Sequence, residues 1–210
     1  ISDGQGYNPA HGWTFTGNVS VNTGTFQWVQ PAGLNPQSAA TSGAGTVTFQ
    51  WKPDTPSALS QVIVSETQQT GYSVTDVACS KNGTAIANVP DTETFTLTGL
   101  AVTDVTTCTV KNKRDTGTIT LNKAWTGGDP GQTTLQIGTS AGGSQVGTQQ
   151  TGAAGAAPLT TGAKTVTTGT YYVSETGGLA NYNGTLACTK NGNAYAPGAN
   201  SSVVVGKNDV

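Results

Sequence analysis

The sequence predicts an all-β protein, and its composition, its turn residues and its strand-like segments all favour that class. Threonine and glycine are abundant, with 29 glycines among 210 residues, while charged residues make up only 10%. β-branched residues suit a pleated, half-buried surface, and glycine marks turns. Methionine is absent, helix formers are scarce, and no window has a sustained 3.6-residue apolar period.

Two motifs recur at one spacing, which indicates an internal repeat. Val-Ser-Glu-Thr begins at Val64 and at Val173, and Ala-Cys-(Ser/Thr)-Lys-Asn-Gly begins at Ala78 and at Ala187, so both pairs are 109 residues apart. Independent motifs with one offset predict two related modules, 1–114 and 115–210. Two copies of that length exceed the 210 residues present. We therefore expect the first module to lack its opening strand and the second to lack its closing strand.

Alternating apolar segments separated by turn signals predict the strands of each module. We expect strands near 13–19, 25–29, 45–51, 60–67, 72–79, 93–98 and 106–111, and again near 118–125, 132–137, 164–167, 170–176, 183–189 and 201–205. About seven short strands in roughly 100 residues is typical of an Ig-like β-sandwich. The Gly/Ala/Thr/Gln-rich stretch 138–163 is expected to form edge strands and long loops inside the second module rather than a linker.

Charge and composition exclude several kinds of partner. The net charge of −2 and the pI of about 5.1 give no basic surface for nucleic acid. The sequence has no run of 18 apolar residues, so we expect no membrane insertion in this segment. One histidine and three dispersed cysteines offer no metal-ligand spacing, and we expect no cofactor.

Strand alternation places four polar residues on apolar faces. These residues are Glu66, Asn112, Lys123 and Glu175. A buried, unpaired lysine or glutamate costs several kcal/mol, so such residues are normally tolerated only when they are paired. The alternative is that they lie at strand ends and extend their charged groups to solvent.

The same segments resemble the SpaA-like, CnaB-type (prealbumin-like) domains of Gram-positive, especially actinobacterial, surface proteins and pilins. The family's first strand has the form G-x-I/L-x-L-x-K, which residues 117–123 fit. Its middle strand has the form G-x-Y-x-V/L-x-E, which residues 169–175 fit, and its last strand ends in C-T-V/I-x-N, which residues 108–112 fit.

This resemblance implies an intramolecular Lys–Asn isopeptide bond in each complete module. It assigns Lys123 as a nucleophile, Asn112 as an amide that is attacked, and Glu66 and Glu175 as the carboxyl groups that promote the reaction. Desolvation keeps such a lysine neutral, and a protonated carboxyl group polarises the amide carbonyl. The missing partners of these residues are expected outside the chain. Such self-crosslinking is not an enzyme activity toward external substrates.

The resemblance also implies a disulfide between Cys79 and Cys108. Such a bond closes a loop of about 30 residues and contributes about 3 kcal/mol. Three cysteines leave an odd one, and Cys188, which matches Cys79 in the repeat, is expected to be unpaired because its partner lies outside the chain. The alternative is that the cysteines are buried free thiols.

The resemblance therefore implies a structural stalk or spacer repeat of an extracellular, cell-wall-anchored or secreted adhesin or pilin-like protein. Its expected partners are neighbouring repeats of the same protein, with host or environmental surface ligands as further candidates. The alternative is a ligand- or carbohydrate-binding module that uses Trp13, Trp28 and Trp51 as a platform. Buried tryptophan rings favour the stalk, and a coplanar exposed set favours glycan binding.

Overall fold

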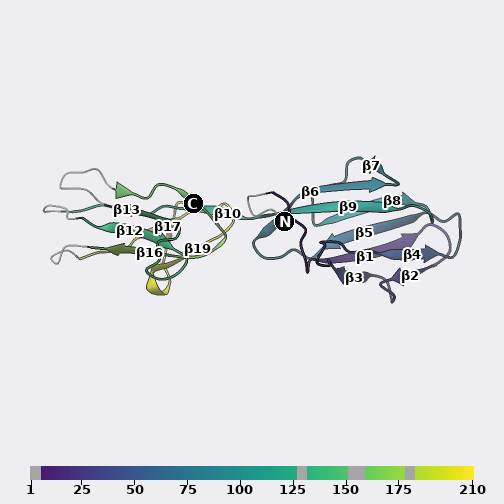
Figure 1. Ribbon diagram of the computed structural model, residues 1–210, viewed down its shortest axis with the longest axis horizontal. Coiled ribbons are helices and arrows are strands. Elements are labelled where there is room, and N and C mark those ends of the chain that lie inside the picture. The colour runs from purple at the N-terminus through teal and green to yellow at the C-terminus, as the bar shows by residue number, and fades with distance from the viewer. Residues whose placement is uncertain (1–5, 127–131, 151–158, 178–182) are drawn as a thin grey trace. The chain divides into compact units, whose positions relative to one another are not determined.

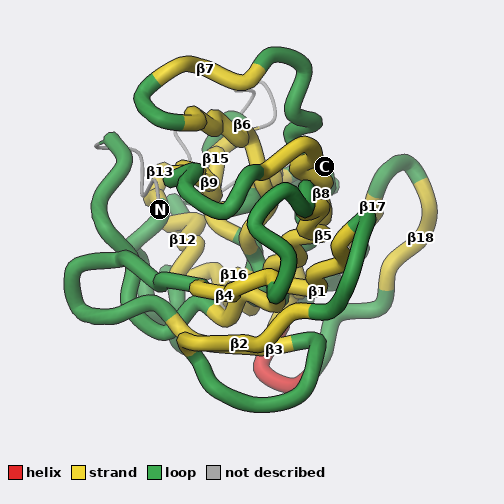
Figure 2. Tube along the Cα trace, turned by 90° about the vertical axis from the view of Figure 1, so that its right-hand side faces the viewer, coloured by secondary structure: helices red, strands yellow, loops and turns green. Residues whose placement is uncertain are grey.

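The computed structural model has an all-β fold, which confirms the predicted class. It describes residues 6–126, 132–150, 159–177 and 183–210. The chain divides into two compact units, Ile1–Arg114 and Asp115–Val210. Figure 2 shows that the chain is almost entirely strand and loop, and the single helical turn among the described residues is the 3-10 turn Ala199–Ser201.

The first unit contains a four-stranded and a three-stranded antiparallel sheet. The four-stranded sheet has the order β3 (Gln37–Ala40), β1 (Thr14–Val21), β5 (Ser60–Glu66) and β8 (Thr94–Leu100). The three-stranded sheet has the order β7 (Thr84–Ile86), β6 (Tyr72–Lys81) and β9 (Thr106–Arg114). A separate ribbon pairs β2 (Phe26–Gln30) with β4 (Gln50–Pro53). Figure 1 labels these strands.

The core of the first unit lies between its two larger sheets, as in a β-sandwich. In β8 the threonines face outward while Phe95 and Leu97 are buried, so the period-two pattern directs the apolar residues inward. They pack in one cluster with Val62 of β5 and with Val77 and Cys79 of β6. The core therefore joins the β5 sheet to the β6 sheet.

The second unit is built around a four-stranded sheet of order β13 (Gly147–Gln150), β12 (Thr134–Gly138), β16 (Gly169–Thr176) and β19 (Ser202–Val205). Three short ribbons accompany it. They pair β10 (Thr116–Ile119) with β15 (Lys164–Thr167), β11 (Asn122–Lys123) with β14 (Leu159–Thr160), and β17 (Cys188–Lys190) with β18 (Asn193–Tyr195). The buried side chains of Ile119, Ile137, Val166, Tyr171, Val173 and Val205 form its core.

The two four-stranded sheets have matching strand orders. β5 lies between β1 and β8, and β16 lies between β12 and β19. Glu66 at the end of β5 is opposite Phe15 of β1, and Glu175 near the end of β16 is opposite Leu135 of β12. The β6–β7 hairpin likewise matches the β17–β18 hairpin, since an Asn-Gly turn joins the strands in both.

Several strand boundaries differ from those predicted. The structure adds β3, β7 and β18, and where strands were predicted at 45–51 and 183–189 it has β4 at 50–53 and β17 at 188–190. The predicted edge strand within 138–163 is present as β13, which pairs with β12, while 151–158 lie outside the described residues. The added strands are short and polar, so backbone pairing rather than an apolar pattern defines them.

Candidate functional site

A carboxyl group and an amide meet inside the first unit. Glu66 ends β5 and Asn112 lies in β9, and their side chains are only 7% and 4% exposed. The side-chain amide of Asn112 donates a hydrogen bond to Glu66 Oε1 at 2.7 Å. Gln68 Nε2 donates in turn to Asn112 Oδ1 at 3.3 Å. Strand parity therefore predicted the inward direction of both residues correctly.

Burial changes the acidity of Glu66. Loss of solvent raises the pKa of this carboxyl group above its usual 4.5, and the Asn112 hydrogen bond only partly opposes that effect. Glu66 Oε2 is buried without a hydrogen-bond partner among the described residues. Glu66 Oε1 therefore contacts the amide nitrogen of Asn112, while the amide oxygen of Asn112 accepts from Gln68 rather than from Glu66.

An amine and a carboxyl group meet in the second unit. Lys123 lies in β11 and Glu175 in β16, and Lys123 Nζ donates to Glu175 Oε2 at 2.8 Å. Their side chains are 16% and 31% exposed. Lys123 Nζ also lies 4.4 Å from the ring centroid of Trp125, a cation–π contact that the sequence did not indicate.

Glu175 lies on the predicted face of β16 but is not buried there. Tyr171 and Val173, on the same face of β16, are buried, but Glu175 is exposed. Parity assigns the face of a strand, whereas burial also requires another element to cover that face. In the first unit, Asn112 of β9 covers Glu66. Among the described residues of the second unit, no strand pairs with β17 in the way that β9 pairs with β6.

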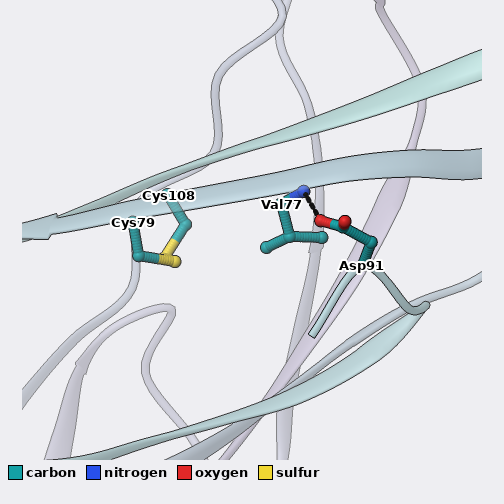
Figure 3. Close-up of a disulfide and its surroundings, with 4 residues drawn as sticks. All are labelled: Val77, Cys79, Asp91 and Cys108. Atoms are coloured by element: carbon teal, nitrogen blue, oxygen red, sulfur yellow. Dashed lines mark hydrogen bonds between the residues drawn. A yellow bond between two sulfur atoms is a disulfide. The ribbon is translucent and has the colours of Figure 1, made fainter. Parts of the chain in front are cut away.

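The disulfide expected in the first unit is present. Cys79 of β6 and Cys108 of β9 are directly opposed and form a disulfide with a Cα–Cα distance of 4.0 Å. Figure 3 shows this bond beside the hydrogen bond that the Val77 N–H donates to Asp91 at 2.7 Å. Cys188 of β17 is a free thiol of intermediate exposure, and its burial raises the pKa of that thiol.

The structure thus brings together two of the three predicted groups (lysine, asparagine and carboxyl) in each unit, and the pair differs between the units. Glu66 and Asn112 meet in the first, and Lys123 and Glu175 meet in the second. Neither unit places all three groups together among its described residues, and no ion pair found there includes Glu66.

Each unit also has a lysine–asparagine clasp that sequence reasoning missed. In the first unit Asn82 accepts from the Val105 N–H and donates to Asp104, which also pairs with Lys81. In the second unit the corresponding contacts, with the same atoms, join Asn191 to Val210 and Asp209, and Lys190 to Asp209. A sequence signal existed, because both Lys-Asn-Gly turns are followed later by an Asp-Val pair.

A groove of about 790 Å³ opens beside Lys123 and Glu175 in the second unit. The segment 118–126, part of β16 and all of β17 line it, together with Asp209 and Val210. Apolar side chains of Leu135, Val173 and Val205 contribute to its walls. The free thiol of Cys188 is among its lining residues.

The three tryptophans considered as a glycan platform belong to the interior of the first unit. Trp13 and Trp28 are 2% and 7% exposed, and Trp51 packs against the core cluster. The rings of Trp28 and Trp51 meet edge to face at 69°, so they are not coplanar.

No family of known proteins, no curated protein and no solved structure matches this chain. The described residues contain no group of three or more histidine, cysteine, aspartate or glutamate side chains that could hold a metal ion. No helix in this part of the chain is long and apolar enough to cross a membrane.

Proposed function

We propose that this chain is a structural stalk or spacer segment of an extracellular surface protein, built from modules of the SpaA-like, CnaB type that self-crosslink through a Lys–Asn isopeptide bond. The observation that carries this proposal is the matched position of Glu66 and Glu175 in sheets of the same strand order, one beside an asparagine and the other beside a lysine. The tryptophans buried in the core favour this function over glycan binding.

The proposed reaction balances without a cofactor. The neutral Nζ of lysine attacks the asparagine side-chain carbonyl, a new C–N amide bond forms, and the C–Nδ2 bond of asparagine breaks. The leaving nitrogen departs as ammonia with a proton from the carboxyl group, and the resulting carboxylate accepts the proton that the lysine nitrogen loses. Each module reacts once, so the chain is not an enzyme toward external substrates. Adjacent repeats are the proposed partners.

The disulfide supports the extracellular location. Bonds of this kind persist in oxidising compartments and are rare in a reducing cytosol. Cys79–Cys108 ties the two longest strands of the first unit together, which suits a segment that bears mechanical load. Anchoring to a cell wall, as in adhesins and pilins, belongs to the same proposal.

Grafting a strand onto the chain tests the crosslink. Residues 106–114 are added directly after Val210, because Val210 makes the same hydrogen bonds as Val105, which precedes β9. After reduction of disulfides, the intact mass is expected to be lower than the calculated mass by one ammonia. The same chain with Lys123→Arg or Glu175→Gln is expected to keep its calculated mass.

The graft also contains a cysteine, which reports whether the strand is in place. If that cysteine pairs with Cys188 while the mass shows no loss of ammonia, the strand has docked without reacting. That result contradicts the proposed isopeptide bond.

A further inference from the structure

We propose that Asn183 is a modification site at which the side-chain amide converts spontaneously in water to a carboxyl group, while the clasps protect Asn82 and Asn191 from the same reaction. The conversion is separate from the proposed function, because it involves no lysine and no bond between strands. It gives the clasp that both units share a second role, which is to preserve the asparagine on which its own hydrogen bonds depend.

The reaction belongs to asparagine followed directly by glycine. Hydroxide takes the proton of the glycine N–H, and that nitrogen attacks the side-chain carbonyl carbon of the asparagine. A C–N bond forms, the C–Nδ2 bond breaks, and the nitrogen leaves as ammonia with a proton from water. Water then opens the cyclic imide at either carbonyl, which gives aspartate or the isomer whose main chain runs through the side chain. Glycine has no Cβ to obstruct the attack.

The sequence contains three such pairs, Asn82-Gly83, Asn183-Gly184 and Asn191-Gly192. Residue order alone therefore does not distinguish them, because the attacking nitrogen belongs to glycine in every case. Their surroundings in the folded chain do differ, and that difference carries the proposal.

Asn183 lies in a segment where nothing restrains its amide. Residues 183–187 belong to no strand and are all exposed. No hydrogen bond joins the Asn183 side chain to the part of the chain that the structure describes. A Cβ placed on Gly184 would meet no atom within 4 Å, so its surroundings are open as well. The amide of Asn183 can therefore turn toward the nitrogen of the next residue without breaking a contact.

The clasp of the first unit holds Asn82 in the opposite way. Asn82 Oδ1 accepts from the Val105 N–H at 2.8 Å, and Asn82 Nδ2 donates to Asp104 Oδ1 at 2.7 Å. Both atoms of the amide are thus directed toward a different segment of the chain rather than toward Gly83. Ring closure requires both bonds to break, so the population of the opened clasp limits the rate.

The acceptor in this clasp is itself fixed. The Ala101 N–H donates to Asp104 Oδ2 at 2.8 Å, and Lys81 Nζ lies 3.4 Å from the same oxygen. Asp104 is therefore held in place independently of its bond to Asn82.

The second unit repeats this protection. Asn191 Oδ1 accepts from the Val210 N–H at 2.8 Å, and Asn191 Nδ2 donates to Asp209 Oδ1 at 2.9 Å. The turn conformation is also the same, with φ of 50° at Asn82 and 52° at Asn191. We therefore expect the two clasped asparagines to convert at similar low rates.

The full 210-residue chain is kept in mildly alkaline buffer made with heavy-oxygen water and is sampled over time. Peptide mass spectrometry locates the oxygen that ring opening introduces, and backbone fragmentation separates aspartate from its isomer. Asn183 is expected to convert about tenfold or more faster than Asn82 and Asn191, because two hydrogen bonds, one of them to a charged group, suppress the opened clasp by at least that factor. Equal rates at the three positions overturn the proposal.

Asp104→Ala tests the clasp directly, because it removes the acceptor of the Asn82 amide. Conversion at Asn82 is expected to rise about tenfold toward the rate at Asn183. Asn191 in the other unit is the internal control and is expected to keep its rate. An unchanged rate at Asn82 contradicts the protective role of the clasp.

Unfolding the chain removes the protection without a substitution. In the reduced chain in guanidinium chloride, the three pairs are expected to convert at similar rates. A difference that persists there contradicts protection by the fold. Gly184→Ala is the matched variant for the exposed site, since open space surrounds residue 184. Its methyl group hinders the attack, so conversion at Asn183 is expected to slow several-fold, and an undiminished rate contradicts the cyclic route.

Discussion

At the scale of single residues, Glu66 is buried, and its Oε1 accepts a hydrogen bond from Asn112. Its Oε2 has no hydrogen-bond partner among the described residues. Burial raises its pKa above 4.5 in the folded chain, with a smaller contribution in the same direction from Glu93. The folded state therefore binds a proton more tightly than the unfolded state. The stability that this carboxyl group contributes is fully present below about pH 4.5 and is lost as the pH rises through the raised pKa.

Glu66→Gln is expected to remove that pH dependence. Glutamine keeps an acceptor for Asn112 and carries no charge, so the variant should match the parent chain in acid and unfold at a higher denaturant concentration at neutral pH. Denaturant midpoints of the first unit measured across this range check the difference. Glu93→Gln serves as the control, because Glu93 is exposed, and an equal pH effect in both variants contradicts the assignment to Glu66.

The pKa of Asp209 shifts in the opposite direction to that of Glu66. Hydrogen bonds from Lys190 first, then from Asn191 and Gly206, lower its pKa to about 2. The stabilising effect of the clasp is thus present above the usual pKa of 3.8 and is lost as the pH falls toward about 2.

Lys190→Gln is expected to raise the pKa of Asp209 more than Lys81→Gln raises that of Asp104. The reason is that the largest influence on Asp104 is the Ala101 backbone N–H rather than its lysine. Carboxyl-carbon NMR titration measures both pKa values in the full chain. Equal pKa shifts of Asp209 and Asp104 would contradict the conclusion that the lysine has the largest influence only at Asp209.

At the scale of elements, the β6–β9 pair contains the disulfide between directly opposed residues. The cross-link restricts the unfolded chain, so Cys79→Ala with Cys108→Ala is expected to lower the free energy of unfolding of the first unit by about 3 kcal/mol. Equilibrium denaturation followed by tryptophan fluorescence measures it, since Trp13, Trp28 and Trp51 lie in this unit. Cys188→Ala is the matched control, and a comparable loss in that variant contradicts the attribution to the bond.

The same elements show what the sequence could predict. Alternation correctly placed Glu66 and Asn112 on the inner faces of β5 and β9, because Val64 and Val110, two positions earlier on the same faces, are apolar. It could not predict that Glu175 is exposed, because that depends on the element that covers β16 and not on β16 itself. The strand β3 escaped prediction because its Gln-, Ser- and Ala-containing segment has little apolar pattern, and only its partner in the sheet defines it.

At the scale of the whole molecule, each unit has a hydrophobic cluster of its own. Trp28 belongs to the first cluster, and Ile137, which is 0% exposed, belongs to the second. Trp28→Ala is expected to lower amide protection in residues 6–114 by about 3–5 kcal/mol, and Ile137→Ala to lower it in the second unit by about 2–5 kcal/mol. Hydrogen exchange read by peptide mass localises each loss, and Val29→Ala and Val204→Ala, at exposed positions, are the controls. Loss of protection in both units from either core variant contradicts the expectation that the two clusters stabilise separate units.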